Sequence, residues 1–136
     1  MKVIRDPKTG EPYLLRWSWR PCRWFGFKIH RILREDFGRD LHDHPWWFAS
    51  LVLRGWYDEE VPARFPRGLL HRAEVGTTVR RIRWFNFKRA TGSHRIVRVA
   101  RHTWTFVITG REDSRQWGFH TASGWVPWQK YLMEGQ

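Results

Sequence analysis

The chain has 136 residues, of which 17% are aromatic, and a formal net charge of +12. This length suits one compact domain with a core of its own, and no apolar run approaches the ~20 residues of a membrane-spanning helix. The first seven residues lack the hydrophobic segment of a signal peptide. A single cysteine, Cys22, excludes an internal disulfide, a thiolate zinc cage and a Cys-x-x-Cys redox pair. We therefore expect a soluble cytoplasmic protein in which nitrogen or oxygen atoms bind any metal.

Short runs that alternate or are continuously apolar follow one another along the chain and are separated by turn signals. The pattern predicts strands at 13–19, 24–32, 46–53, 79–87, 95–99, 103–108 and 116–120. Only 27–34 or the tail from Tyr131 could form a short helix. Many short strands predict an all-β sandwich or barrel. Residues 1–37 are expected to pack on or extend it, and a strand pair within 3–20 offers an open edge for a homodimer.

Two histidines precede the most strand-like run, in the segment Leu41-His42-Asp43-His44-Pro45. Successive strand side chains point to opposite faces, so His42 and His44 share a face and can bind one metal ion. Asp43 should point away from that ion and pair with an arginine or orient a neighbouring loop. If the strand continues inward in phase, the side chains that face the interior are Trp46, Phe48, Ser50 and Val52.

A third imidazole is available at His94, which opens the run 95–99 and shares one side with Ile96 and Arg98. His120 is a further candidate, either as a fourth ligand or as a general acid or base, because imidazole titrates close to neutral pH. His102 is a weaker candidate for the same roles. His30 and His71 are expected on the surface.

These segments resemble the two sequence motifs of the cupin superfamily of small jelly-roll barrels, and the resemblance extends from about residue 38 onward. His42 and His44 match the histidine pair of the first motif and Gly55 its closing glycine. The segment Ala90-Thr91-Gly92-Ser93-His94 resembles a worn second motif, so His94 takes the place of the third histidine. Residues 41–57, 104–110 and 117–120 are similar to poorly characterised cupin-like proteins of bacteria and phages. The resemblance implies a double-stranded β-helix barrel with a metal centre.

The departures from the motifs define what remains of that centre. Phe48 stands at the position of the motif glutamate, and Arg98 replaces an asparagine. A three-histidine site is left, which resembles the centres of thiol-dioxygenase-type cupins. Imidazole ligands suit iron, nickel, copper or zinc, so the identity of the ion stays open.

The basic half of the chain predicts an anionic substrate. No acidic residue lies between Glu74 and Glu112, and arginines there should attract anions. The candidates for substrate binding are Arg83, Arg95, Arg98 and Arg101, with Trp104 as a wall residue and Tyr57 as a wall or catalytic residue. The predicted function is that of a metal-dependent oxygenase or isomerase acting on a small anion.

Two other functions compete with this one. A metal-free, epimerase-like cupin would use a histidine paired with an acid on a phosphorylated sugar. A nucleic-acid-binding module would use the interleaved arginines and aromatics of 16–25 and 80–89 to hold a single strand. In a half-buried strand the same alternation places aromatics inward and arginines outward.

Overall fold

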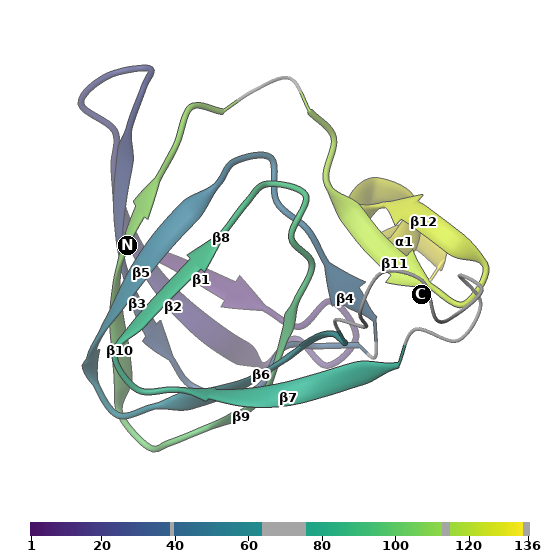
Figure 1. The fold of residues 1–136 in the computed structure, drawn as a ribbon, viewed down its shortest axis with the longest axis horizontal. Coiled ribbons are helices and arrows are strands. Elements are labelled where there is room, and N and C mark those ends of the chain that lie inside the picture. The colour runs from purple at the N-terminus through teal and green to yellow at the C-terminus, as the bar shows by residue number, and fades with distance from the viewer. Residues whose placement is uncertain (39, 64–75, 113–114, 135–136) are drawn as a thin grey trace.

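The computed structural model describes residues 1–38, 40–63, 76–112 and 115–134 (Figure 1). The described residues are mainly in antiparallel strands, with one short helix near the C-terminus. In chain order the elements are β1 (Lys2–Arg5), β2 (Pro12–Trp19), β3 (Gly26–Ile32), β4 (Leu41–His42), β5 (Phe48–Arg54), β6 (Tyr57–Pro62), β7 (Thr77–Ile82), β8 (Phe85–Lys88), β9 (Arg95–Val99), β10 (Thr103–Thr109), β11 (Gly118–Thr121), β12 (Gly124–Pro127) and α1 (Trp128–Glu134).

The largest sheet has six strands in the order β1-β2-β3-β10-β5-β8. Its central strand β10 alternates strictly between buried and half-buried side chains, the pattern of a strand with one face toward a core. Thr105 and Val107 point inward from β10. The predicted inward phase of β5 is confirmed, because Phe48, Ser50 and Val52 are buried.

Two three-stranded sheets complete the fold, in the orders β12-β11-β4 and β7-β6-β9. The all-β expectation is therefore confirmed. The described strands form three separate sheets, however, and not one continuous closed barrel. A hydrophobic cluster of Ile32, Val52, Tyr57 and Ile82 lies between the six-stranded sheet and the β7-β6-β9 sheet.

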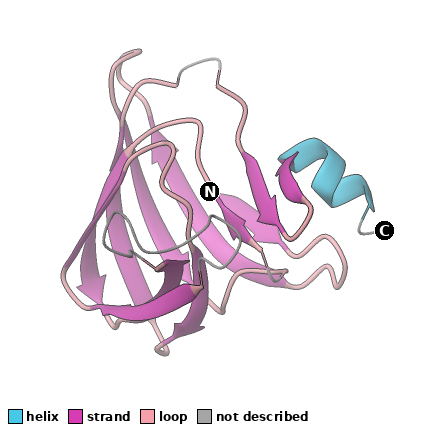
Figure 2. Ribbon diagram, turned by 45° about the vertical axis from the view of Figure 1, so that its right-hand side comes forward, coloured by secondary structure: helices cyan, strands magenta, loops and turns pink. Residues whose placement is uncertain are grey.

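Several predicted element boundaries need correction. The run 79–87 forms two strands, β7 and β8. The segment 27–34 forms no helix, because residues up to Ile32 belong to strand β3. The strands β4, β6 and β12 are additional to the prediction, whereas β1 pairs with β2 as the strand pair expected within 3–20. Of the two segments expected to be able to form a helix, the C-terminal tail does so, and α1 lies at the outside of the molecule beside β11 and β12 (Figure 2). Among the described residues, no helix has the length and apolar character to cross a membrane.

Candidate metal centre

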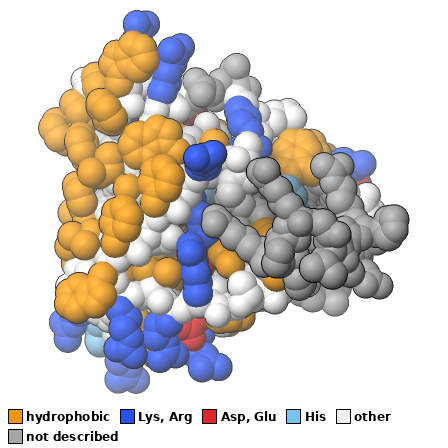
Figure 3. Space-filling view, viewed as in Figure 1, with side chains coloured by type: hydrophobic (Ala, Val, Ile, Leu, Met, Phe, Trp, Pro, Cys, Tyr) orange, Lys and Arg blue, Asp and Glu red, His pale blue; other side chains and the backbone are white. Residues whose placement is uncertain are grey.

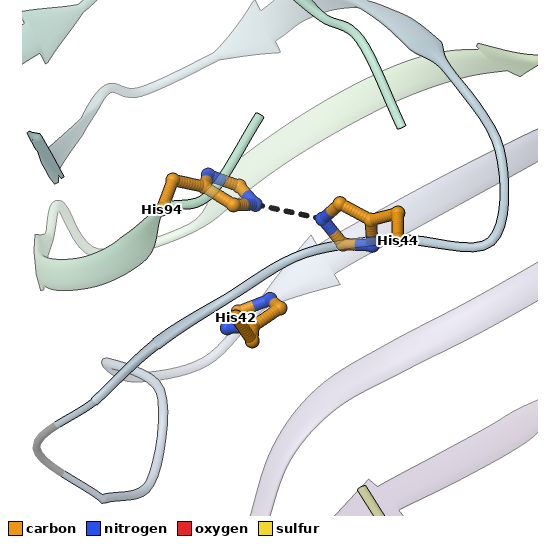
Figure 4. Close-up of side chains that lie close together, drawn as sticks. All are labelled: His42, His44 and His94. Atoms are coloured by element: carbon orange, nitrogen blue, oxygen red, sulfur yellow. Dashed lines mark hydrogen bonds between the residues drawn. The ribbon is translucent and has the colours of Figure 1, made fainter. Parts of the chain in front are cut away.

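His42, His44 and His94 come together in one cluster (Figure 4). Each offers a ring nitrogen, and these three nitrogens lie within 4.8 Å of one another. The closest pair is Nε2 of His44 and Nε2 of His94, which are 2.9 Å apart. Tetrahedral metal–nitrogen bonds of about 2.1 Å place donor atoms roughly 3.4 Å apart, a spacing that lies between the closest observed distance and the 4.8 Å limit of the cluster.

The main chain fixes the relative position of the two ligand segments. The amide of His42 donates to the carbonyl of His94 at 2.9 Å, and the amide of His94 donates to the carbonyl of His42 at 3.0 Å. This isolated antiparallel bridge connects β4 with the residue that precedes β9. The cluster therefore sits at the junction between two of the three sheets.

Asp43 anchors the backbone between His42 and His44. Its carboxylate is 1% exposed and accepts hydrogen bonds from the Gly118 amide at 2.9 Å, from Arg115 at 3.1 Å and from the Trp125 indole at 3.1 Å. The predicted pairing of Asp43 with an arginine is thus confirmed. We call the segment from His42 to His44 the ligand loop. These hydrogen bonds attach it to β11 and β12 of the β12-β11-β4 sheet.

A buried carboxylate behind His94 was missed by the sequence analysis. Oε2 of Glu59, on β6, accepts the Nδ1–H of His94 at 2.8 Å, and Glu59 is 0% exposed. The same carboxylate is bound by Arg80, Lys88 and Asn86. Burial raises the pKa of Glu59, but the hydrogen bond from His94 and the nearby cations outweigh it and lower the pKa to about 2. Glu59 is therefore ionised and holds the proton on Nδ1 of His94, so Nε2 of His94 faces the cluster without a proton and is within hydrogen-bond distance of Nε2 of His44.

The histidines open into a cavity of about 160 Å³ between the inner face of the six-stranded sheet and the ligand loop. Such a volume suits a small organic molecule rather than a drug-sized one. Most of the wall is apolar, contributed by residues such as Phe48, Val107 and Phe119. Tyr57 also lines the cavity, where its hydroxyl accepts a hydrogen bond from Asn86 at 3.0 Å. Burial raises the pKa of Tyr57, so the hydroxyl stays protonated.

Two cations reach the cavity from the N-terminal strands, Arg16 on β2 and Lys28 on β3. They flank His30, whose Nε2 accepts a hydrogen bond from Arg16 at 3.2 Å. Burial, with Arg16 and Arg20 nearby, lowers the pKa of Lys28 to about 7. The cavity also has one carboxylate in its wall, Asp36, which accepts the Ile96 amide. With a dipositive ion on the histidines, positive charge would exceed negative charge in this space.

Burial keeps His30, His42 and His44 neutral at pH 7. It lowers the pKa of His42 to about 4 and that of His30 to about 3, and it lowers the pKa of His44 well below the usual value. Neutral imidazole is the form that binds metals. The predicted surface position of His30 is wrong, since this side chain lines the cavity, and His71 lies outside the described residues.

The predicted substrate-binding arginines do not line the cavity. Arg83 and Arg98 are exposed, and Arg95 pairs with Glu60 on the neighbouring strand. A β-bulge explains why Arg98 is exposed. Glu59 pairs with Ile96 but Asp58 pairs with Arg98, so β9 has one extra residue at this point. The extra residue reverses the phase, and Arg98 points outward although Ile96 points inward.

Three further candidates also lie outside the cavity. Trp104 is on the outer face of β10 and stacks on Trp17, with ring centroids 5.7 Å apart. Nε2 of His120 lies 3.4 Å from Asp43 on the far side of the ligand loop, and its side chain is 44% exposed. Arg101 is exposed as well.

These features define the class as a β-rich, cupin-like fold with a cluster of three histidines. No protein-family model matches the chain, and no curated protein matches it. A solved structure does match, that of the DMSP lyase DddQ from Ruegeria pomeroyi DSS-3, with a TM-score of 0.50 and 12% sequence identity. The match covers 78% of this chain and 51% of the lyase, so the chain spans about half the length of that protein. At this identity the likeness concerns the fold alone.

Proposed function

We propose that this protein is a metal-dependent enzyme that acts on a small organic anion in the cavity. His42, His44 and His94 bind a divalent transition metal, which is iron, nickel, zinc or copper. The observation that supports this most strongly is the meeting of three imidazoles, one buried and two half-buried, whose donor nitrogens lie within 4.8 Å, with one of them oriented by Glu59.

The donor set fits such an ion well. Three neutral imidazoles leave positions free for substrate or solvent, which a catalytic site requires and a structural site lacks. A carboxylate on the far nitrogen of a ligand histidine is the usual way to fix its tautomer and raise its basicity. Glu59 occupies that position toward His94. A bound divalent ion would supply a Lewis acid that polarises the substrate.

The remaining residues hold the substrate and exclude water. Arg16 and Lys28 attract its anionic group, and the aromatic and aliphatic walls surround its apolar part. Tyr57 keeps a proton on its hydroxyl within the cavity and can donate it to a substrate oxygen. Oxygen insertion and isomerisation are both compatible with these roles. An elimination, the reaction class in the name of the lyase with the similar fold, is a third.

Metal titration tests the proposal directly. Purified protein, stripped with a chelator and then titrated with Fe²⁺, Ni²⁺, Zn²⁺ or Cu²⁺, should bind one equivalent of at least one ion and gain thermal stability with it. Elemental analysis of protein purified without chelator should find the same ion. Failure of all four ions to bind at one equivalent would exclude the metal centre.

Substrate binding should depend on pH through Lys28. Lys28 is charged below its pKa of about 7 and loses its proton as the pH rises through that value. The affinity for a small carboxylate should therefore fall between about pH 6 and pH 8, because the anion loses one of its two cationic partners. In the Lys28→Met variant the affinity should be lower at pH 6 and should show less of this decline. Calorimetry with acetate and propanoate at three pH values measures both effects, and an unchanged pH profile in Lys28→Met would contradict the assignment.

A second candidate function is metal-free acid–base catalysis, as in an epimerase-like cupin that acts on a phosphorylated sugar. The contact between His94 and Glu59 favours it, because a histidine paired with a carboxylate can act as a general base. The cavity of about 160 Å³ is small for a nucleotide sugar. A protein that remains fully active after complete metal removal would support this alternative over the first.

A further inference from the structure

The outer face of the six-stranded sheet is apolar from β2 to β8. Strand register aligns one row of side chains across five strands, namely Trp17, Ile29, Phe106, Leu51 and Phe85. A second row, one pleat along, consists of Trp19, Phe27, Ile108, Ala49 and Phe87. We call these two rows the outer aromatic face. Neither row contains a polar or charged side chain.

Much of the outer aromatic face is exposed. Trp19 is 67% exposed and Phe85 is 63% exposed, and four more of its members exceed one third. Figure 3 shows hydrophobic side chains gathered along one side of the molecule, with lysines and arginines toward both ends. At about 200 Å² for a complete side chain, the six exposed members alone present roughly 600 Å². That equals the upper range of about 300–600 Å² for the largest apolar patch of a monomer.

We infer that the outer aromatic face is the interface of a homodimer, in which the sheets of two copies pack face to face. With the half-buried members of both rows, the area approaches the ~800 Å² that each partner contributes to a stable interface. Two flat sheet faces stack about 10 Å apart with interdigitating side chains. Because both rows lack charge, a second copy would bury no unpaired charge there. This mode differs from the edge-to-edge pairing through residues 3–20 expected from the sequence.

The arrangement of rings and cations favours a second copy over a nucleic acid. Phe27 stacks on both Trp19 and Phe106, with interplanar angles of 28° and 15°, so neighbouring rings already cover one another. Bases need free ring faces and adjacent cations. The cations lie beyond the two rows, with Arg31 and Arg54 in the next row at one end.

The salt dependence of association distinguishes the partners. Two copies, each with a net charge of +12, repel one another, so added salt should strengthen a dimer held by apolar contact. A nucleic acid or an anionic membrane would bind more weakly as salt rises. Sedimentation equilibrium at about 50 and about 500 mM NaCl measures the sign of this effect. We expect twice the mass of the 16.6 kDa chain and a smaller dissociation constant at the higher salt.

A matched pair of variants tests the location of the interface. Leu51→Lys puts a charge inside the outer aromatic face, between Phe106 and Phe85, and should raise the dimer dissociation constant at least about 100-fold. Val79→Lys adds the same charge on β7, where Val79 is 56% exposed away from this face, and should leave the constant unchanged. If circular dichroism shows that Leu51→Lys is unfolded, Phe85→Lys on β8 replaces it. A monomeric native protein, an equally stable Leu51→Lys dimer, or association that requires an oligonucleotide or anionic vesicles and weakens with salt would each overturn the inference.

Discussion

Replacement of His94 by alanine is expected to remove the metal from the protein. Two imidazoles would remain, and the carboxylate of Glu59 would lose the ring that it orients. Mutation of outer-shell partners alone weakens metal affinity by about 10–100-fold. Removal of a ligand should therefore weaken the affinity by more than about 100-fold. The expected readout is a metal content near zero in elemental analysis, together with loss of the metal-dependent rise in melting temperature.

His42→Ala should give the same result, since it removes a ligand from the other segment of the cluster. His102→Asn is the control: His102 is exposed and has a φ of 59°, a backbone conformation that asparagine tolerates. This variant should keep its full metal content. An ion retained at full occupancy in both His42→Ala and His94→Ala would refute the ligand assignment.

Replacement of Glu59 by leucine should have the largest effect on stability. Glu59 is 0% exposed, and its carboxylate binds His94, Asn86, Arg80 and Lys88. Breaking a buried ion pair by removal of one partner costs about 3–5 kcal/mol, because the other partner stays buried without it. Lys88, whose side chain is 9% exposed, would lose its ion pair with Glu59. Urea unfolding of the metal-free protein measures the loss directly.

Two comparison variants separate charge, hydrogen bonding and position. Glu59→Gln keeps an oxygen that can accept the Nδ1–H of His94, so it should retain more metal affinity than Glu59→Leu. Glu60→Gln alters the next residue, which pairs with Arg95 near the surface, and should change stability by about 1 kcal/mol or less. Equal unfolding free energies for Glu59→Leu and Glu60→Gln would show that the buried network does not stabilise the fold.

The histidine cluster was predicted from strand parity and from one motif resemblance. The expected strand ends at His42, so His44 lies outside it, yet both rings reach the cavity and the inward phase resumes at Phe48 and Ser50 beyond Pro45. The antiparallel all-β character followed from short runs between turn signals. The position of His94 depended on the resemblance to a second motif, since nothing in its own segment indicates a ligand.

The charged residues of the site could not be found in the same way. Glu59 lies in the acidic run Asp58-Glu59-Glu60, which reads as a solvated face, although the alternation with Tyr57 places it inward. Arg16 and Lys28 follow a reversed pattern: on β2 and β3 the aromatics face outward and these cations face the cavity. Arginines in strands usually point to solvent. The cavity that these two cations line is formed by segments distant in the chain, so no local pattern indicates it.

The bulge in β9 could not be predicted from the alternation of residues along the strand. A sequence pattern of period two predicts that Ile96 and Arg98 share a face of the strand. A single extra residue of β9 in the pairing with β6 turns the side chain of Arg98 to the opposite face. Pairing partners that are distant in the chain determine such an insertion. The bulge turns Arg98 away from the cavity without changing any motif.

The reciprocal amide bonds between His42 and His94 would give a bound ion a structural role as well. An ion bound by His44 and His94 would connect two residues that are 50 positions apart in the chain. The backbone hydrogen bonds between His42 and His94 already join the same two segments. Like a removable crosslink, the ion would close a long loop and deprive the denatured chain of many conformations. Release of the ion would then loosen the attachment of β4, β11 and β12 to the rest of the molecule, and the stability of the fold would depend on metal supply.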